Sequence, residues 1–176
     1  MAAMAMNLKL LLLMGILSSG LFVLAWQKVS PPEVFTASQA EAGRTAYERT
    51  CAKCHVSDLR GRPGRGRDGR GPLGEQSKLP PISSLSPGYQ QFIGKRGFVP
   101  PLTGEAFISR WGDKTAGELV ARFDETVTDP FFQFEDVKDD TTVNITAYVL
   151  QVNGAKAGAQ PLTRTTAANV SETVKR

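Results

Sequence analysis

The chain has 176 residues, of which 41% are hydrophobic and 22% charged, and this composition excludes a disordered or fibrous polymer. Its length allows one modest domain with appendages and excludes a multidomain enzyme. Lys and Arg number 21 against 17 Asp and Glu, and the resulting net charge of +4 is too weak a bias to indicate nucleic-acid binding.

The N-terminus carries an uncharged, largely apolar run behind a single basic residue, Lys9. Such a run, here residues 10–26, is typical of an export signal or a membrane anchor, and its length lies between a signal-peptide core and a full bilayer span. Hydropathy alone leaves cleavage open, although Val23 and Ala25 satisfy the small-residue rule for cleavage after Ala25. We therefore predict a signal peptide or an N-terminal membrane anchor over residues 1–25.

A linker and a helix are predicted next. Pro31 and Pro32 mark residues 26–36 as an extended linker, with the folded domain beginning near Thr36 or Ser38. Residues at helical spacing follow these two candidate N-caps, so a first helix is predicted to run into the pair of cysteines that comes after it.

An Arg- and Gly-rich stretch follows the cysteines. Residues 60–71 hold five Arg and five Gly, offer no apolar side chain to bury, and belong to a long irregular stretch that ends at Pro101. This insert could dock an acidic partner protein, steer association or touch anionic lipid headgroups, and it could equally be a solvated loop. RNA binding ranks last because it conflicts with an export signal.

Helical signals return in the second half of the chain. Residues 104–111 are predicted to form a short apolar turn, and Thr115 with Glu118 forms a capping box that opens a helix from residue 116 to about 127. A last helix, capped at residues 139–141, is predicted to end at Asn153 and Gly154. The Ala-, Thr- and Gly-rich residues 155–176 are predicted to form a loosely packed tail. Because no strand pattern is convincing, the predicted fold class is all-α with long loops.

The rarest residues of the chain gather in one motif, Cys-Ala-Lys-Cys-His. It contains both cysteines and the only histidine, as Cys51, Cys54 and His55. The C-x-x-C-H spacing is the signature of covalent c-type haem attachment. Two thiols three residues apart at a helix end can reach the two vinyl groups on one edge of a porphyrin, and the next residue swings an imidazole under the iron. We therefore predict one covalently bound haem c, held by Cys51 and Cys54, with His55 as its proximal iron ligand.

Three other interpretations account for fewer of these residues. A disulfide between Cys51 and Cys54 would close a very short loop and leave His55 unexplained. A thioredoxin-like redox pair needs a strand before the motif and a helix that starts at its first Cys, whereas here a helix is predicted to end at the motif. A zinc site would have only three of its four ligands nearby, and the chain has no second C-x-x-C or His.

With this motif, the sequence resembles the class I c-type cytochromes, and most closely the single-haem domains that accompany periplasmic dehydrogenases. The resemblance covers residues 37 to about 162 apart from the insert. It implies a cytochrome c-like fold of about three main helices around a covalently bound haem, with residues 37–154 as the domain. In this family the first and last helices cross closely beside the haem edge, and Gly43 and Tyr47 facing Tyr148 resemble that crossing.

The resemblance also assigns roles to residues near the haem. The sequence Pro100-Pro101-Leu102-Thr103-Gly104 resembles the family loop in which a Pro carbonyl accepts the N–H of the proximal His, and either Pro100 or Pro101 fits that role. Trp111 would lie near a haem propionate as an N–H donor, or would pack as an ordinary core residue.

The chain departs from the family at the sixth iron ligand. Family members carry a Met at the end of the penultimate helix, where this chain has Val127, and no Met or second His occurs downstream. The distal ligand is therefore predicted to be absent, a water molecule, or an unusual donor such as a Lys, a Tyr or Asn153. Three aromatic residues could wall the distal face or serve as core, namely Phe131, Phe132 and Phe134.

These features predict an exported monohaem c-type cytochrome, and not an enzyme. It would carry single electrons between a periplasmic dehydrogenase and a respiratory acceptor, in the periplasm or anchored to the membrane facing it. The loss of a Met ligand predicts a lower reduction potential. The alternative is a haem protein that binds or processes CO, NO, O2 or peroxide at an open distal iron. The expected partners are redox proteins and, where the anchor is retained, the membrane, with no nucleic acid.

Overall fold

The computed structural model describes residues 30–62, 83, 87, 90–91, 99–130, 134 and 137–174. The predicted signal or anchor, residues 26–29 of the linker and most of the insert lie outside these residues. The pattern of contacts between residues divides the chain into two compact units, residues 1–30 and residues 31–176. Every element described below belongs to the second unit. Over the described residues the fold is mostly helical, with three isolated β-bridges and no sheet, so the predicted all-helical class is confirmed there. None of the described helices has both the length and the apolar character that a membrane span requires.

The first helix, α2 (Ala37–Arg49), begins as the sequence predicts. Its N-cap is Thr36, whose hydroxyl accepts from the backbone N–H of Gln39 while the Gln39 side chain accepts from that of Thr36. This reciprocal pair satisfies two backbone donors that the first turn leaves open. The helix ends at Arg49, with Thr50 as its C-cap. A single turn, α3 (Ala52–His55), follows, and together with its N-cap Cys51 it carries the Cys-Ala-Lys-Cys-His motif.

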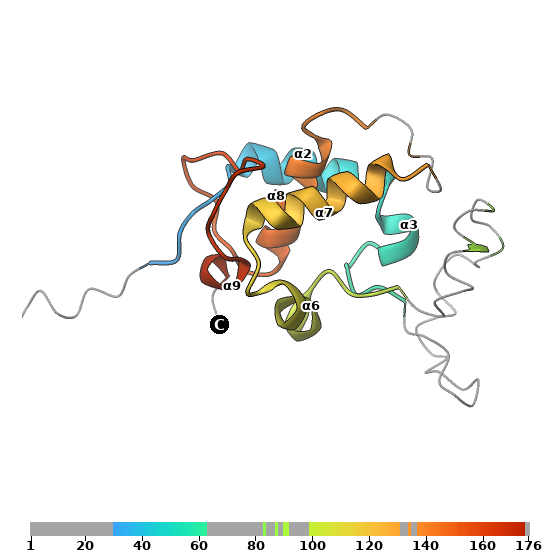
Figure 1. Ribbon diagram of the computed structural model, residues 1–176, viewed down its shortest axis with the longest axis horizontal. Helices are drawn as coiled ribbons and strands as arrows, with labels where there is room; N and C mark the ends of the chain where they lie inside the picture. The colour runs from blue at the N-terminus through green and yellow to red at the C-terminus, as the bar shows by residue number, and fades with distance from the viewer. Residues whose placement is uncertain are drawn as a thin grey trace, which may run out of the picture. The chain divides into compact units, whose positions relative to one another are not determined.

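Among the described elements, the most extensive helix contact is between α2 and α8 (Thr141–Val152) (Figure 1). At the crossing, a Cβ placed on Gly43 would lie 1.8 Å from the carbonyl oxygen of Asn144, so only glycine fits. Beside it, the rings of Tyr47 and Tyr148 pack with centroids 5.5 Å apart in a tilted arrangement. The predicted crossing of these two helices is confirmed.

In the described part of the chain, α6 and α7 are the two helices that directly precede α8. Residues predicted to form a short turn make a two-turn helix, α6 (Gly104–Trp111). The next helix, α7 (Ala116–Thr128), opens with the predicted capping box of Thr115 and Glu118 and packs against α8. At the end of α8, Gly154 takes the left-handed conformation with φ of 96°, as a C-terminal glycine is expected to do.

The predicted linker and tail both belong in part to the core, which corrects the sequence-based boundaries. Val34 and Phe35, at the end of the predicted linker, are buried, and the Phe35 carbonyl accepts from the N–H of Gly158. Leu162 and Val170 in the predicted tail are buried too. The domain therefore extends at both ends beyond residues 37–154.

The tail is held in place because it contributes residues to the core and also supplies hydrogen-bond acceptors to the first turn of α7. The N–H groups of Ala116 and Gly117, in the first turn of α7, donate to the carbonyls of Ala168 and Thr166. These donors have no partner inside the helix, so the tail supplies acceptors that water would otherwise provide. A further short helix, α9 (Val170–Thr173), follows them. Sparse but well-placed apolar residues thus make an ordered segment out of an Ala/Thr-rich sequence.

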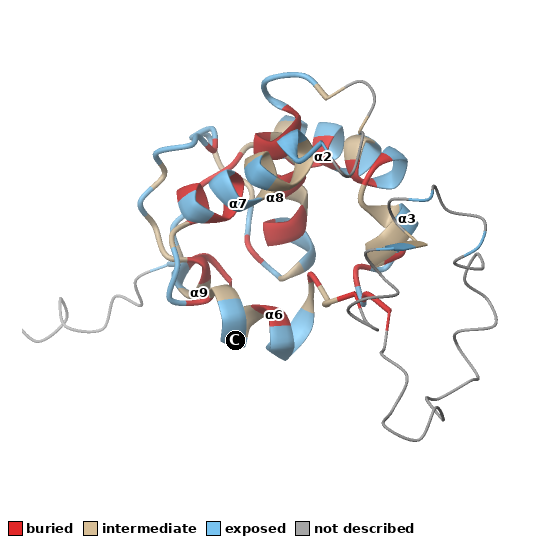
Figure 2. Cartoon of the chain, turned by 45° about the vertical axis from the view of Figure 1, so that its right-hand side comes forward, coloured by how far each residue is buried: buried red, intermediate tan, exposed pale blue. Residues whose placement is uncertain are grey.

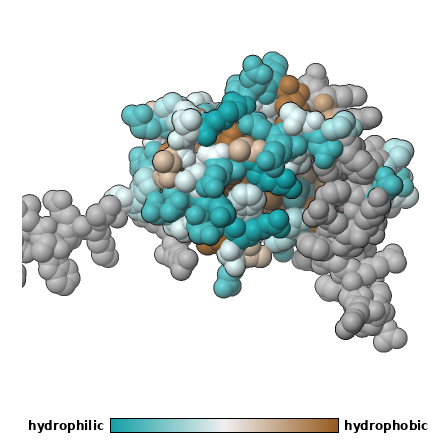
Figure 3. All heavy atoms as spheres, viewed as in Figure 1, coloured by the Kyte–Doolittle hydropathy of each residue, from teal (hydrophilic) through white to brown (hydrophobic). Residues whose placement is uncertain are grey.

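The buried faces of the helices turn toward one another and leave a polar exterior. Figure 2 shows the buried positions of α2, α7, α8 and α9 on their inner sides. The face seen in Figure 3 is largely hydrophilic. Among the described residues, Val152 is the one large hydrophobic side chain in the exposed class, at 40%.

Candidate functional site

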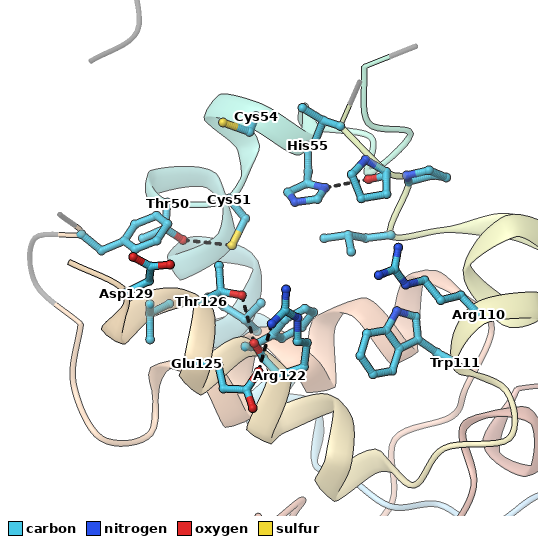
Figure 4. A pocket seen from close by; sticks show the side chains of 18 residues that line it. Thr50, Cys51, Cys54, His55, Arg110, Trp111, Arg122, Glu125, Thr126 and Asp129 are labelled. Carbon is cyan, nitrogen blue, oxygen red and sulfur yellow. Dashed lines mark hydrogen bonds and ion pairs between the residues drawn. The ribbon is translucent and has the colours of Figure 1, made fainter. Parts of the chain in front are cut away.

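A cavity of about 260 Å³ lies between α3, residues 99–102, the end of α6 and the second half of α7 (Figure 4). This volume lies just below the range of about 300–1,000 Å³ that is usual for small-molecule sites. Cys51, Cys54 and His55 all contribute to its lining. The structure therefore brings the three residues singled out by the sequence to one concave site.

The motif turn is held by backbone bonds on both sides. The carbonyl of Cys51 accepts from the N–H of Cys54 at 3.1 Å and of His55 at 2.8 Å. Directly after the turn, Val56 has a φ of 57°, a conformation that is strained for a β-branched residue. The buried hydroxyl of Tyr47 donates to the Val56 carbonyl at 2.7 Å. A side chain of α2 thus fixes the exit from the motif.

His55 is oriented by one carbonyl, and that carbonyl belongs to Pro100. Its Nδ1 lies 2.8 Å from the Pro100 oxygen. Because a carbonyl can only accept, Nδ1 carries the proton and Nε2 keeps a free lone pair. Burial lowers the pKa of His55 to about 4, against the opposing effect of the Pro100 bond. At neutral pH the ring is therefore neutral, which is the form that binds a metal.

The two cysteines are free thiols in an environment that disfavours thiolates. Burial raises the pKa of Cys51 to about 11, although the Thr50 hydroxyl donates to its sulfur at 3.4 Å. Burial also raises the pKa of Cys54, which the charges of Arg62 and Lys53 partly oppose. A thioredoxin-like pair needs a lowered pKa, so this environment argues against one. The order of the helices does not argue against such a pair, because α3 starts directly after Cys51.

The disulfide and zinc alternatives gain no support from the described residues. Cys51 and Cys54 are not bonded to each other. In the part of the chain that the structure describes, no three His, Cys, Asp or Glu side chains are arranged to hold a metal ion.

The α7 wall of the cavity carries an apolar and a polar stripe. Phe123 and Val127, four residues apart, form the apolar stripe, and Arg122 and Thr126 the polar one. The Thr126 hydroxyl donates to the Arg122 carbonyl at 2.9 Å, and the Arg122 guanidinium pairs with Glu125 at 2.9 Å. Val127, at the position expected for a Met ligand, does face the cavity.

No described residue that lines the cavity is a Met, Lys or Tyr, and no His besides His55 lines it. Asn153, suggested as a distal ligand, does not line the cavity. Its amide nitrogen donates to the carbonyls of Leu102 and Val149, and its amide oxygen accepts from the N–H of Gly104. Asn153 thus fastens the start of α6 to the end of α8. Of the three aromatic residues suggested for the distal face, Phe134 lines the cavity, whereas Phe131 and Phe132 lie outside the described residues.

The end of α6 brings two donor side chains to the cavity, Arg110 and Trp111 (Figure 4). Trp111 was predicted to lie near the site, whereas Arg110 and Arg122 were not singled out. A helical register could have found Arg122, because it lies one turn before Thr126 and so shares its face. For Arg110, the only feature of the sequence that could have indicated a place at the cavity is that it lies next to Trp111.

Comparison of the chain with protein-family models, with curated proteins and with solved structures finds no match.

Proposed function

We propose that this protein is a monohaem c-type cytochrome, with a cytochrome c-like fold, that carries single electrons. The observation that carries the proposal is the joint placement of Cys51, Cys54 and His55 on one cavity, with His55 held through Nδ1 by the Pro100 carbonyl. A disulfide or a redox dithiol needs no such arrangement of the His, and a zinc site would need further ligands that the described residues do not bring together. Covalent haem attachment uses all three residues.

The chemistry of the lining fits a haem. Cys51 and Cys54 offer reduced thiols, and His55 offers a neutral imidazole with Nε2 free. The guanidinium of Arg110 and the indole N–H of Trp111 suit the carboxylates at a porphyrin edge. An apolar set suits the porphyrin face, namely Val99, Leu102, Phe123, Val127, Phe134 and Ile145.

When bound, a haem supplies an iron that accepts and releases one electron. The chain would contribute the rest. Cys51 and Cys54 would fix the group covalently, so that it is not lost between partners. His55 would bind the iron through Nε2, with the Pro100 carbonyl fixing its tautomer and raising its basicity. The apolar lining would exclude water and so influence the potential.

The cellular setting of the proposal rests on the sequence. The N-terminal apolar run supports export, with the domain in the periplasm or tethered to the membrane facing it. The electron donor would be a periplasmic dehydrogenase and the acceptor a respiratory protein. In the described residues, no acid, base or nucleophile constellation separate from the cavity argues for an enzyme of another kind.

A second candidate function is favoured by the α7 wall. Val127 and Phe123 occupy the face of the cavity where a Met ligand is expected, and neither can bind iron. An iron left open on this side would bind CO, NO, O2 or peroxide. The two candidate functions differ in whether the distal coordination position of the iron is occupied by a ligand from the protein or left open.

One experiment tests the haem and separates the two candidates. The full chain is produced with haem-maturation machinery, and haem staining is read on a denaturing gel, with a Cys51→Ser/Cys54→Ser double variant as control. Stain that follows the wild-type polypeptide and is lost in the variant is expected, and absence of stain from the wild type would refute the proposal. Absorption spectra of the reduced protein, with and without CO, then distinguish the two candidate functions. Low-spin bands unmoved by CO indicate an electron carrier, and bands shifted by CO indicate ligand binding.

A further inference from the structure

Gly61 makes an unusually close approach to the carbonyl that orients His55. Its φ is +69°, a conformation that glycine adopts without strain. A Cβ built on it would lie 2.2 Å from the Val99 oxygen and 2.8 Å from the Pro100 oxygen. Pro100 is the residue whose oxygen accepts from His55 Nδ1. Any side chain at position 61 would therefore compete for space with the hydrogen-bond acceptor of the proximal His.

A short antiparallel clasp holds this approach in place. Arg62 and Val99 exchange both backbone bonds, at 3.0 Å and 2.9 Å. The N–H of Leu102 donates to the Leu59 carbonyl at 2.8 Å, and the N–H of Gly61 donates to the His55 carbonyl at 3.0 Å. Pro100 has no N–H of its own, so its neighbours in this clasp determine where its carbonyl points.

We propose that Gly61 is a positioning residue for His55: by having no side chain, it lets the Pro100 carbonyl reach Nδ1 and so sets the tautomer and basicity of the ring. The redox consequence of this role rests on the proposed function, whereas the tautomer is a property of the polypeptide. A methyl group at position 61 pushes the Pro100 carbonyl away and weakens its bond to His55. A His with a weaker bond is a less basic ligand and stabilises the oxidised iron less.

The chain offers a matched control in Gly104. It also has a positive φ, of +77°, but a Cβ there would meet nothing within 4 Å. Gly104→Ala and Gly61→Ala therefore carry the same kind of backbone strain, and only the second crowds the Pro100 carbonyl. A difference between the two variants reports on the contact and not on the strain.

The first measurement is the midpoint potential of the full-length, haem-loaded protein, with haem content checked by the pyridine haemochrome. Gly61→Ala is expected to shift the potential to a more positive value, while Gly104→Ala stays at the wild-type value. An unchanged potential in Gly61→Ala, or an equal shift in both variants, would overturn the proposal. Simple destabilisation would not move the potential of the folded protein in one variant alone.

The second measurement uses the full chain without haem, after circular dichroism has shown that its helices are formed, and so does not depend on haem attachment. The chain has a single His, so one pair of imidazole ¹⁵N signals reports its tautomer. The wild type is expected to be protonated at Nδ1, Gly104→Ala likewise, and Gly61→Ala to gain the Nε2-protonated form. A wild-type ring protonated at Nε2 would refute the proposal, and this result needs no variant to fold. Should Gly61→Ala fail to fold, Val99→Pro removes one bond of the clasp without adding an atom at position 61. It is expected to shift the tautomer in the same direction, and an unshifted tautomer would count against the proposal.

Discussion

Arg164, in the C-terminal segment, forms a two-point ion pair with Asp124, 40 residues earlier on α7. Its Nε lies 2.9 Å from Oδ2, and its Nη2 lies 3.2 Å from Oδ1. Asp124 also accepts from the hydroxyl of Thr142 on α8, and Arg164 donates to the carbonyl of Asp139. One carboxylate therefore joins three separate segments of the chain.

The stability of the domain should depend on the charge of Asp124 at low pH. Burial raises the pKa of this carboxyl, but the bonds from Arg164 and Thr142 and the Arg164 charge outweigh it, and the pKa lies below its ordinary value. Because the folded-state pKa is the lower one, the stabilisation is complete above the unfolded-state pKa of about 4 and is lost as pH falls through the folded value. We expect the free energy of unfolding to drop below pH 4, and to drop less in Asp124→Asn. Asp113→Asn, at a side chain that is 78% exposed, is the control and should keep the wild-type pH profile. Equal acid sensitivity of wild type and Asp124→Asn would contradict the assignment.

Substitution of Gly43, even by alanine, should strongly lower the stability of the domain. A Cβ at this position would lie 1.8 Å from the Asn144 carbonyl oxygen. This oxygen belongs to the backbone, so a change of side-chain rotamer cannot relieve the clash. We expect Gly43→Ala to lower the free energy of unfolding by about 3 kcal/mol or more, because α2 and α8 must separate. Denaturant unfolding followed by circular dichroism measures the loss. Ala42→Ser, on the exposed side of the same helix, should change stability by no more than about 0.5 kcal/mol. Tolerance of alanine at position 43 would show that the helices cross elsewhere.

The two threonine N-caps of α6 and α7 offer a paired test of capping. The hydroxyl of Thr115 accepts from the N–H of Glu118, whereas Thr103, at the start of α6, makes no side-chain cap bond. We expect Thr115→Ala to cost about 1 kcal/mol of stability and Thr103→Ala only a small fraction of that. Thermal unfolding of both variants provides the comparison, and similar losses at the two positions would argue that the cap bond contributes nothing.

Introducing a thioether at position 127 should change the chemistry of the site. Val127 faces the cavity, and Met is unbranched and adaptable enough to be accommodated on the α7 wall. In the haem-loaded protein we expect Val127→Met to raise the midpoint potential and to reduce any CO binding, since Met ligation favours the reduced iron. Val152→Met, at an exposed position on α8 that does not line the cavity, should leave both properties unchanged. A CO response that is equal in wild type and Val127→Met would place the distal side of the haem elsewhere.

Much of the helical framework could be predicted because its signals are local. A capping box needs only two residues three apart, so the starts of α2 and α7 are readable from the sequence. The crossing of α2 with α8 was expected from the family resemblance, and Gly43 fits it because a glycine lets two backbones approach closely. The three motif residues are confined to one turn, so their proximity follows from the chain itself.

What could not be predicted depends on contacts between distant segments. Leu162 and Val170 are too widely spaced to give a periodic signal, and their burial arises from acceptors that the tail offers to the first turn of α7. The choice of Pro100 over Pro101 is set by the pairing of Arg62 with Val99, which no local pattern contains. Arg110 reaches the cavity only because α6 ends there.

The pairing of Arg62 with Val99 has a consequence for how this protein can vary. Arg62 and Val99 are direct neighbours across this bridge although they lie 37 positions apart in the sequence, and the entropy of closing a connection depends only weakly on its length, at about 0.6 kcal/mol for each doubling. The pairing of Arg62 with Val99 should therefore tolerate a change in the number of residues between them, such as an inserted recognition peptide or reporter. The helices that form the cavity would not have to be redesigned for either change.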